Sequence, residues 1–155
     1  VIWRPVLLGG IFKATGNSGP AFTVAAKMPY MFKDLERLVT HYHLPFAMPA
    51  HFPANTVTVQ RLLCAASDSE RAALTLKLYH AYWGQGKDIT NVELLTELAG
   101  TELVARTQDE TIKNQLKANT EEAVARGAFG APTFFLGDEM YFGEDRLFLV
   151  HEAIK

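Results

Sequence analysis

The spacing of hydrophobic residues predicts a chain that is helical in its middle. Apolar positions recur at the period of one helix face between residues 35 and 42, and three prolines then keep the next segment extended. Capping residues and terminal glycines mark further helices. The first of these is capped by Asn55 and ends near Ala66, and the second is capped by Asp68 and ends at Gly84. A third begins at Thr90 or Asn91 and ends at Gly100, and a short helix follows around Leu103. The last runs from about Asp109 to Arg126. Val92, Leu95 and Leu98 are expected to face the core.

The N-terminal end has a strand-like composition instead. Residues 1–8 are rich in β-branched and large apolar side chains, and Gly9 and Gly10 end this run. A strand is therefore predicted there. Residues 11–27 are rich in Gly, Asn, Ser, Thr and Pro, with Gly, Asn and Pro gathered at 16–20, and this composition predicts a loop.

The C-terminal end predicts a hairpin followed by a helix. Apolar runs flank a turn at Gly137 and Asp138, and Pro132 stands before the first run. Proline has no backbone N–H, so it fits the first position of a strand and not its interior. The last helix begins near Asp145, a residue that can cap it.

Neither end supplies enough strands for a stable sheet, so we expect the two ends to share one. The layout predicts an α/β fold in which helices are inserted into a small strand-containing domain. We predict that residues 1–27 and 120–155 form this discontinuous domain and that residues 28–119 form the helical insertion.

Composition narrows the functional classes. The 155 residues carry a net charge of -2 with no basic block, which argues against nucleic-acid binding. No apolar run reaches the ~20 residues of a membrane-spanning helix. The single cysteine, Cys64, excludes an internal disulfide and indicates a reducing, cytoplasmic location. Cys64 lies beside the apolar stripe of a predicted helix, and we interpret it as structural.

The sequence lacks the residue patterns of metal binding, of hydrolase catalysis and of phosphate binding. His41 and His43 point to different faces of a helix and have no third ligand nearby in sequence, so no metal site is predicted. No Ser-His-Asp order and no nucleophile elbow supports a hydrolase. The glycines near residue 10 miss the spacing of a phosphate-binding loop.

Two regions are candidates for ligand binding. The backbone N–H and C=O of Ala131 have no obvious partner in a β-ladder, so a ligand with peptide groups can supply the missing hydrogen-bond partners. The plainer alternative is that Pro132 closes an ordinary loop. Asn17 and Lys27 place an amide and a cation on one segment, which suits a ligand's amide and carboxylate, or they are solvated loop residues.

The start of the last helix is a third candidate region. Glu144 and Asp145 complement the positive end of the helix dipole, which capping alone would explain. A carboxylate there can also bind the ammonium of an α-amino acid, while nearby N–H groups bind its carboxylate. A γ-glutamyl group offers both charges.

Four blocks of sequence together resemble one known family. They are GIFKATGN at 10–17, KNQLK at 113–117, GAFGAP at 127–132 and FGEDRL at 142–147. In this order they resemble the 2-hydroxychromene-2-carboxylate isomerases and the kappa-class glutathione transferases, which are DsbA-like members of the thioredoxin superfamily. The resemblance runs along the whole chain.

The resemblance implies a thioredoxin-like fold with an inserted all-helical domain, a cis-proline at Pro132, and glutathione as the cofactor. Asn17 and Lys27 would contact its glycine end, and Ala131, before Pro132, would pair with its cysteinyl backbone. Asp145 would hold the γ-glutamyl end. The family has a small hydroxyl residue where this chain has Glu144, so we expect the second carboxylate to alter or weaken γ-glutamyl recognition there.

The family also carries a strand and a serine motif near its start, and this serine stabilises the glutathione thiolate. A thiol with a pKa near ~8.5 needs such a donor to ionise at neutral pH. These 155 residues contain no such segment. We therefore expect the catalytic serine upstream of Val1, with the N-terminal strand and helix missing from this chain.

The resemblance favours a glutathione-dependent isomerase that acts on 2-hydroxychromene-2-carboxylate or a similar aromatic pyruvate-type substrate in aromatic catabolism. It further implies a homodimer with a small aromatic carboxylate as its substrate. Three alternatives remain: a kappa-type glutathione transferase or peroxidase, a disulfide oxidoreductase of the same fold, and a non-enzymatic module that binds thiol peptides.

Overall fold

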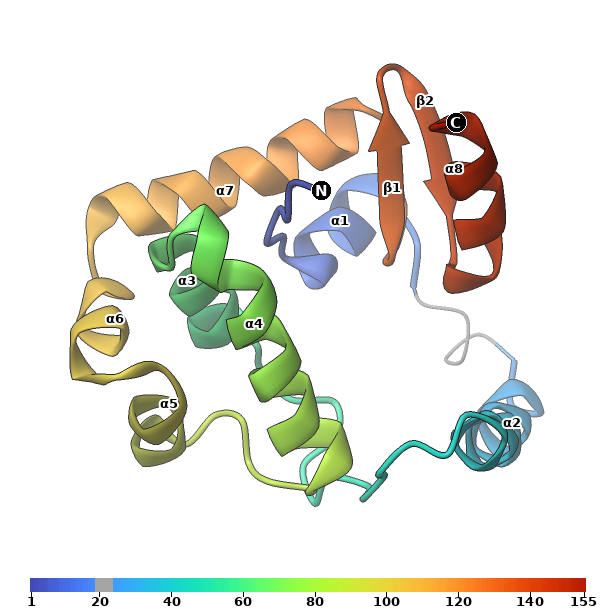
Figure 1. Ribbon diagram of the computed structural model, residues 1–155, viewed down its shortest axis with the longest axis horizontal. Helices are drawn as coiled ribbons and strands as arrows, with labels where there is room; N and C mark the ends of the chain where they lie inside the picture. Colours follow the sequence, from blue (N-terminus) through green and yellow to red (C-terminus); the bar gives the residue numbers. More distant parts are fainter. Residues whose placement is uncertain (19–23) are drawn as a thin grey trace.

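The computed structural model describes residues 1–18 and 24–155, and in it a small hairpin lies toward one side of a mainly helical fold (Figure 1). In chain order the elements are α1 (Leu8–Thr15), α2 (Lys27–His41), α3 (Val57–Ala65), α4 (Asp68–Tyr79), the π-helical turn η1 (His80–Gly84), α5 (Val92–Ala99), α6 (Thr101–Arg106), α7 (Glu110–Ala125), β1 (Thr133–Leu136), β2 (Glu139–Phe142), the 3-10 turn η2 (Glu144–Arg146) and α8 (Leu147–Ala153). The helical middle and the C-terminal hairpin predicted from the sequence are confirmed.

The main core lies where α3, α4 and α5 meet. Leu62 and Leu95 are fully buried in it, and Leu78 and Ile89 are nearly so. Asn91 begins α5 by accepting a hydrogen bond at its side-chain oxygen from the Leu94 N–H, at 3.0 Å. The local cap at Asn91 and the burial of one helix face therefore both favour the helix at α5.

The long helix α7 joins the helical middle to the hairpin. It packs against α3 and α1, and its C-terminal end leads into the loop before β1 (Figure 1). The β1 and β2 strands pair antiparallel, with Thr133 opposite Phe142 and Leu136 opposite Glu139. The turn at Gly137, where φ is +58°, connects them, and α8 packs against β1.

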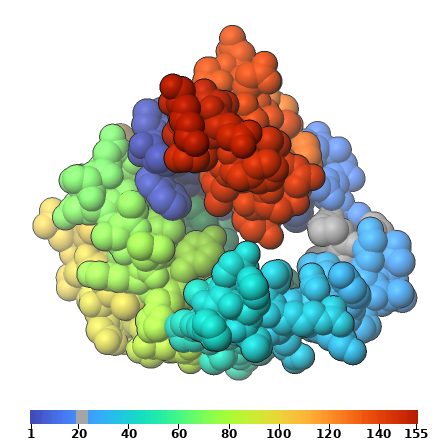
Figure 2. Space-filling model, turned by 45° about the vertical axis from the view of Figure 1, so that its right-hand side comes forward, coloured from blue at the N-terminus to red at the C-terminus, as the bar shows by residue number. Residues whose placement is uncertain are grey.

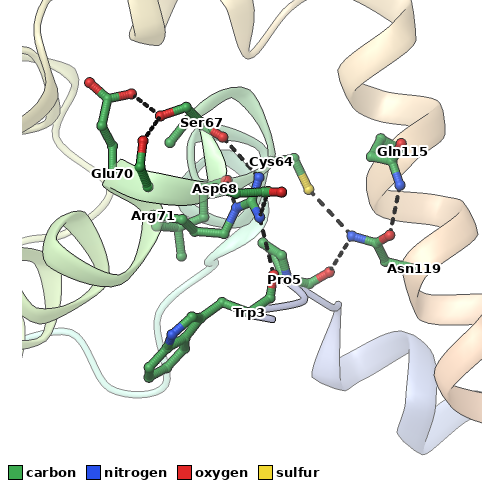
Figure 3. A network of polar contacts seen from close by, with 12 residues as sticks. Trp3, Pro5, Cys64, Ser67, Asp68, Glu70, Arg71, Gln115 and Asn119 are labelled. Atoms are coloured by element: carbon green, nitrogen blue, oxygen red, sulfur yellow. Dashed lines mark hydrogen bonds and ion pairs between the residues drawn. The ribbon is translucent and has the colours of Figure 1, made fainter. Parts of the chain in front are cut away.

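Buried polar side chains fix the extended segment that precedes α1. Asn119 donates to the Pro5 carbonyl at 3.1 Å, and the Thr120 hydroxyl accepts from the Leu7 N–H at 3.0 Å. From α4, Arg71 donates to the Trp3 carbonyl at 3.2 Å and to carbonyls at the end of α3 (Figure 3). This segment is thus held by side chains of α4 and α7.

The predicted strand at residues 1–8 was wrong. Residues 1–7 form neither helix nor strand, and α1 begins at Leu8 and includes Gly9 and Gly10. The expected shared sheet is also wrong, since within the described residues β1 pairs with β2 alone. The predicted loop at 11–27 is helical up to Thr15, and Gly19 and Pro20 of that loop lie outside the described residues.

Three details of the helix predictions also need correction. Ser67, one residue before Asp68, is the N-cap position of α4, and its hydroxyl bonds the Glu70 carboxylate. Val92 is 55 % exposed instead of facing the core. Asp145 makes no capping hydrogen bond, because η2 precedes α8 and the Asp145 carboxylate pairs with Arg146.

Helix α2 stands apart from the core. None of its residues is buried, although its apolar positions follow the predicted helical spacing. Figure 2 shows α2 at one corner of the molecule and the hairpin with α8 at another. In the part of the chain that the structure describes, no helix combines the length and apolar character needed to cross a membrane.

Replacing Asn119 with leucine, which has a similar size, tests whether this side chain of α7 holds the segment before α1. Asn119→Leu removes the donor to the Pro5 carbonyl and the acceptor of the Gln115 amide. Leaving these groups unpaired should lower the free energy of unfolding by about 1–3 kcal/mol. Urea denaturation measures this loss. The matched control is Asn114→Leu on the exposed side of α7, and an equal loss in both variants would contradict the anchor.

Candidate functional site

The loop between α7 and β1 forms the centre of the candidate site. The Ala131–Pro132 peptide bond is cis, as the family resemblance implied. The Thr133 hydroxyl donates to the Gly130 carbonyl at 2.8 Å, which closes the turn from inside. The loop therefore presents Ala131 and Pro132, both exposed, at the end of the hairpin.

The backbone of Ala131 is open to a ligand. The neighbouring Pro132 carbonyl accepts a hydrogen bond from the Gly143 N–H at 3.0 Å. Among the described residues, in contrast, neither the N–H nor the C=O of Ala131 has a hydrogen-bond partner. Because Ala131 is exposed, water can satisfy both groups, and an extended peptide can replace that water.

Asn17 connects the end of α1 to this loop. Gly16 ends α1 with φ at +70°, and the next residue, Asn17, donates its side-chain N–H to the Phe129 carbonyl at 2.9 Å. Phe129 lies two residues before Ala131. The structure thus brings a residue from the start of the chain to the cis-proline loop.

Gly143 places the acidic turn beside the same loop. It is buried and has φ +95° and ψ 150°, a conformation that strongly favours glycine. A Cβ atom at this position would lie 2.5 Å from an Asp145 carboxylate oxygen. The Asp145 carboxylate is therefore folded back over Gly143, whose N–H binds the Pro132 carbonyl.

The charge of Asp145 is partly balanced within its own turn. One carboxylate oxygen accepts from the Arg146 guanidinium at 2.5 Å, and both side chains are more than half exposed. A surface pair of this kind contributes little to stability because water screens it. The carboxylate is thus able to exchange Arg146 for a cationic group of a ligand.

Two aromatic rings form the apolar part of the site. The Phe129 and Phe142 ring centroids are 4.5 Å apart, and each side chain is 40 % exposed. The Phe142 ring also packs on Gly130, where a Cβ atom would come within 2.8 Å of it. Sequence reasoning gave these aromatics no role, although the glycines beside them, at 130 and 143, are a usable signal of close packing.

The remaining candidates are placed less centrally. Glu144 begins η2 and is exposed next to Asp145. Lys27 is the first residue of α2, and its backbone N–H binds the Val24 carbonyl at 2.9 Å. Within residues 1–18 and 24–155, no hydrogen bond or ion pair joins the Lys27 side chain to the cis-proline loop. The structure therefore brings together Asn17, Ala131, Pro132 and Asp145, with Glu144 beside them.

Cys64 belongs to a different part of the molecule. It lies on α3, and its sulfur is 3.8 Å from the Asn119 amide nitrogen in the network of Figure 3. Burial raises the pKa of the Cys64 thiol, and the nearby Arg71 only partly offsets this. A protonated thiol is a poor nucleophile, which agrees with a structural role.

Comparison with known proteins gives a consistent result. A family model described as a DSBA-like thioredoxin domain matches residues 1–155. The 2-hydroxychromene-2-carboxylate isomerase of Pseudomonas putida is 30% identical over 148 residues, which cover 91% of this chain and 72% of the relative. Glutathione S-transferase kappa 1 of Rattus norvegicus is 32% identical over 168 residues, covering 95% and 74%.

A solved structure agrees with these relatives. It is a 2-hydroxychromene-2-carboxylate isomerase that superposes with a TM-score of 0.83 at 28% identity. The superposition covers 96% of this chain and 76% of that one. The helices and the hairpin therefore form a DSBA-like thioredoxin fold.

Two glycine variants test how Gly143 positions the Asp145 carboxylate. Gly100 has nearly the same backbone angles, φ 87° and ψ 153°, but no atom lies within 4 Å of its would-be Cβ. Gly143→Ala and Gly100→Ala should each lose about 1–3 kcal/mol of unfolding free energy. Only Gly143→Ala should shift the carbonyl carbon resonance of the Asp145 side chain in an NMR spectrum. An unchanged resonance would show that Gly143 does not position Asp145.

The raised pKa of Cys64 predicts slow and pH-shifted alkylation. Below the pKa the thiol stays protonated, so the iodoacetamide rate should rise with pH around a midpoint above that of an unstructured cysteine peptide. Limited access lowers the rate at every pH but leaves the midpoint unchanged. A midpoint at or below that of the peptide would mean that burial does not control this thiol.

Proposed function

The chain belongs to the family of DSBA-like thioredoxin domains, together with the 2-hydroxychromene-2-carboxylate isomerases and kappa-class glutathione transferases, and we propose that it is a glutathione-dependent isomerase. The proposed substrate is 2-hydroxychromene-2-carboxylate or a similar aromatic pyruvate-type compound of aromatic catabolism. The observation that carries the proposal is the open Ala131 backbone beside the Asp145 carboxylate, in a family associated with glutathione.

The site residues fit the chemical groups of glutathione. The unpartnered N–H and C=O of Ala131 match the backbone groups of the cysteinyl residue, which can bind them as an added β-strand would. The Asp145 carboxylate matches the ammonium of the γ-glutamyl group. Glu144 adds a second carboxylate at that end, which strengthens attraction for the ammonium and opposes the γ-glutamyl carboxylate.

The opposite end of the cofactor is assigned to Asn17 and Lys27. Asn17 is fixed at the loop through its bond to the Phe129 carbonyl, so it is suited to position the glycine end. Lys27 supplies a cation for the terminal carboxylate from the start of α2. The exposed Phe129 and Phe142 rings offer an apolar surface beside the loop for an aromatic substrate.

When bound, glutathione supplies a thiolate that adds reversibly to the conjugated substrate, so the isomerisation involves no net redox change. The protein must lower the pKa of that thiol with a hydrogen-bond donor. In the described part of this loop the hydroxyl of Thr133 is already donated to the Gly130 carbonyl. Thr133 is therefore not assigned this role.

A kappa-type glutathione transferase or peroxidase is the second candidate. The rat kappa enzyme, at 32% identity, is as similar to this chain as the isomerases are. Both activities use the same cofactor site, so the residues described above do not separate them. Their reactions differ, because a transferase leaves glutathione joined to the product.

We further propose two parts within the chain: a thioredoxin-like part at 1–27 and 120–155, and a helical insertion at 28–119. The boundary falls inside α7, which packs against both α1 and α3 and so belongs to both parts. We also propose that the protein forms a homodimer and is located in the cytoplasm. The location is inferred from the single cysteine, which fits a reducing compartment.

Asp145→Asn tests the proposed function. We expect isomerisation of 2-hydroxychromene-2-carboxylate, followed by its absorbance, to require glutathione. Calorimetry should show glutathione binding about 10- to 100-fold more weakly in this variant, since a hydrogen bond to a charged group contributes roughly 1.5–3 kcal/mol. The control is Asp138→Asn in the exposed hairpin turn, which should bind normally.

Different results point to different conclusions. Isomerisation without glutathione would reject the cofactor. Unchanged affinity in Asp145→Asn would remove this residue from the site. Glutathione conjugates formed from an electrophilic aromatic probe, without any isomerisation, would favour the transferase.

A further inference from the structure

Away from the cis-proline loop, a concave site lies between α1, α3 and α7, and α7 packs against the other two helices (Figure 1). It is a groove of about 530 Å³, within the range of roughly 300–1,000 Å³ typical of small-molecule sites. Its walls are mainly apolar. The lining residues are Leu7, Gly10, Ala14, Arg61, Lys113, Leu116, Lys117, Thr120, Glu121, Val124 and Ala125.

The groove is preformed by fixed elements of the fold. The Thr120 hydroxyl accepts from the Leu7 N–H at 3.0 Å and donates to the Leu116 carbonyl at 2.8 Å. Gly10 allows α1 to approach α7 closely, because a Cβ there would lie 3.1 Å from a Thr120 methyl. Leu116 is almost fully buried. A ligand would therefore meet an apolar wall whose backbone is held by these hydrogen bonds and by close helix packing.

The cationic residues of the groove differ in how they are paired. Lys113 binds the Glu110 carboxylate at 2.7 Å, and Lys117 lies 3.8 Å from Glu121. Arg61 has no hydrogen bond or ion pair with any described residue, and its Nε atom is buried without a partner. A buried donor left unpaired is unfavourable, and an acceptor from a ligand would satisfy it.

The surrounding charges support an anion of low charge. The Lys113 ammonium, which binds the Glu110 carboxylate, and the charge of Arg61 help to hold the pKa of that carboxyl below the usual range. Each lysine already has a carboxylate partner, so Arg61 is the cation of the groove that lacks one among the described residues. The groove therefore has room for one negative charge, next to an apolar wall.

We propose that this groove binds an amphipathic monocarboxylate, with its head group on Arg61 and its apolar body along the wall formed by Leu7, Ala14 and Val124. The site is separate from the proposed glutathione site and does not depend on it. It favours a carboxylate over a neutral molecule, since a planar guanidinium pairs well with a carboxylate. The second negative charge of a dianion would find no unpaired cation among the described residues of the groove, because both lysines already have carboxylate partners.

The test uses decanoate as the probe and calorimetry of the whole protein as the measurement. Decanoate should bind at least 10-fold more tightly than decanol, which has the same chain length and no charge. Arg61→Gln should weaken decanoate binding at least 10-fold. The control Arg37→Gln, on exposed α2, should leave it unchanged. No saturable binding, or equal affinity for the two probes, would overturn the proposal.

A second variant covers the case in which Arg61→Gln fails to fold. Ala14→Leu places a larger side chain in the groove from the exposed side of α1 and should also weaken decanoate binding. Asp145→Asn should leave decanoate binding unchanged, which separates this site from the glutathione site. Unchanged binding in Ala14→Leu, or a loss in Asp145→Asn, would count against the groove.

Discussion

An extended segment with no strand partner must satisfy its backbone polar groups by other means, and this requirement shapes the fold. The segment before α1 carries carbonyl and N–H groups that β-ladder bonds do not satisfy within the described residues. Asn119 and Thr120 of α7 and Arg71 of α4 bind these groups instead. Buried polar groups without partners are costly, so these side chains hold the segment in one position.

The position of that segment sets the position of α1, and α1 sets the candidate site. Asn17 follows α1 directly and binds the Phe129 carbonyl at the end of α7. The hairpin then returns through Gly143, whose N–H binds the Pro132 carbonyl and whose missing side chain leaves room for Asp145. Three regions distant in sequence therefore meet at one loop through backbone carbonyls.

The predictable part of this structure is the part that local sequence determines. Helix spacing, the Asn91 cap and the Gly137 turn all act within a few residues, and those elements form as predicted. The first eight residues look like a strand by composition, but their conformation depends on Asn119 and Thr120, more than a hundred residues away. No local pattern indicates such partners.

The site was predictable only where motif and geometry coincide. Asn17, Ala131 and Asp145 belong to sequence blocks that resemble a known family, and the structure places them around one loop. Phe129 and Phe142 lie in the same blocks, yet exposed aromatic residues and core aromatic residues have the same appearance in a sequence. Their packing across the hairpin becomes visible only once the Gly130 contact is known.

The proposed glutathione site and the groove involve the same helices but present opposite charges. The turn at Glu144 and Asp145 presents carboxylates at the hairpin, which suits the ammonium group of a ligand. The groove along α7 presents Arg61 of α3 and two paired lysines, which suits a carboxylate. Since α1 and α7 form walls of the groove and also lead into Asn17 and Phe129, one packing arrangement shapes both regions.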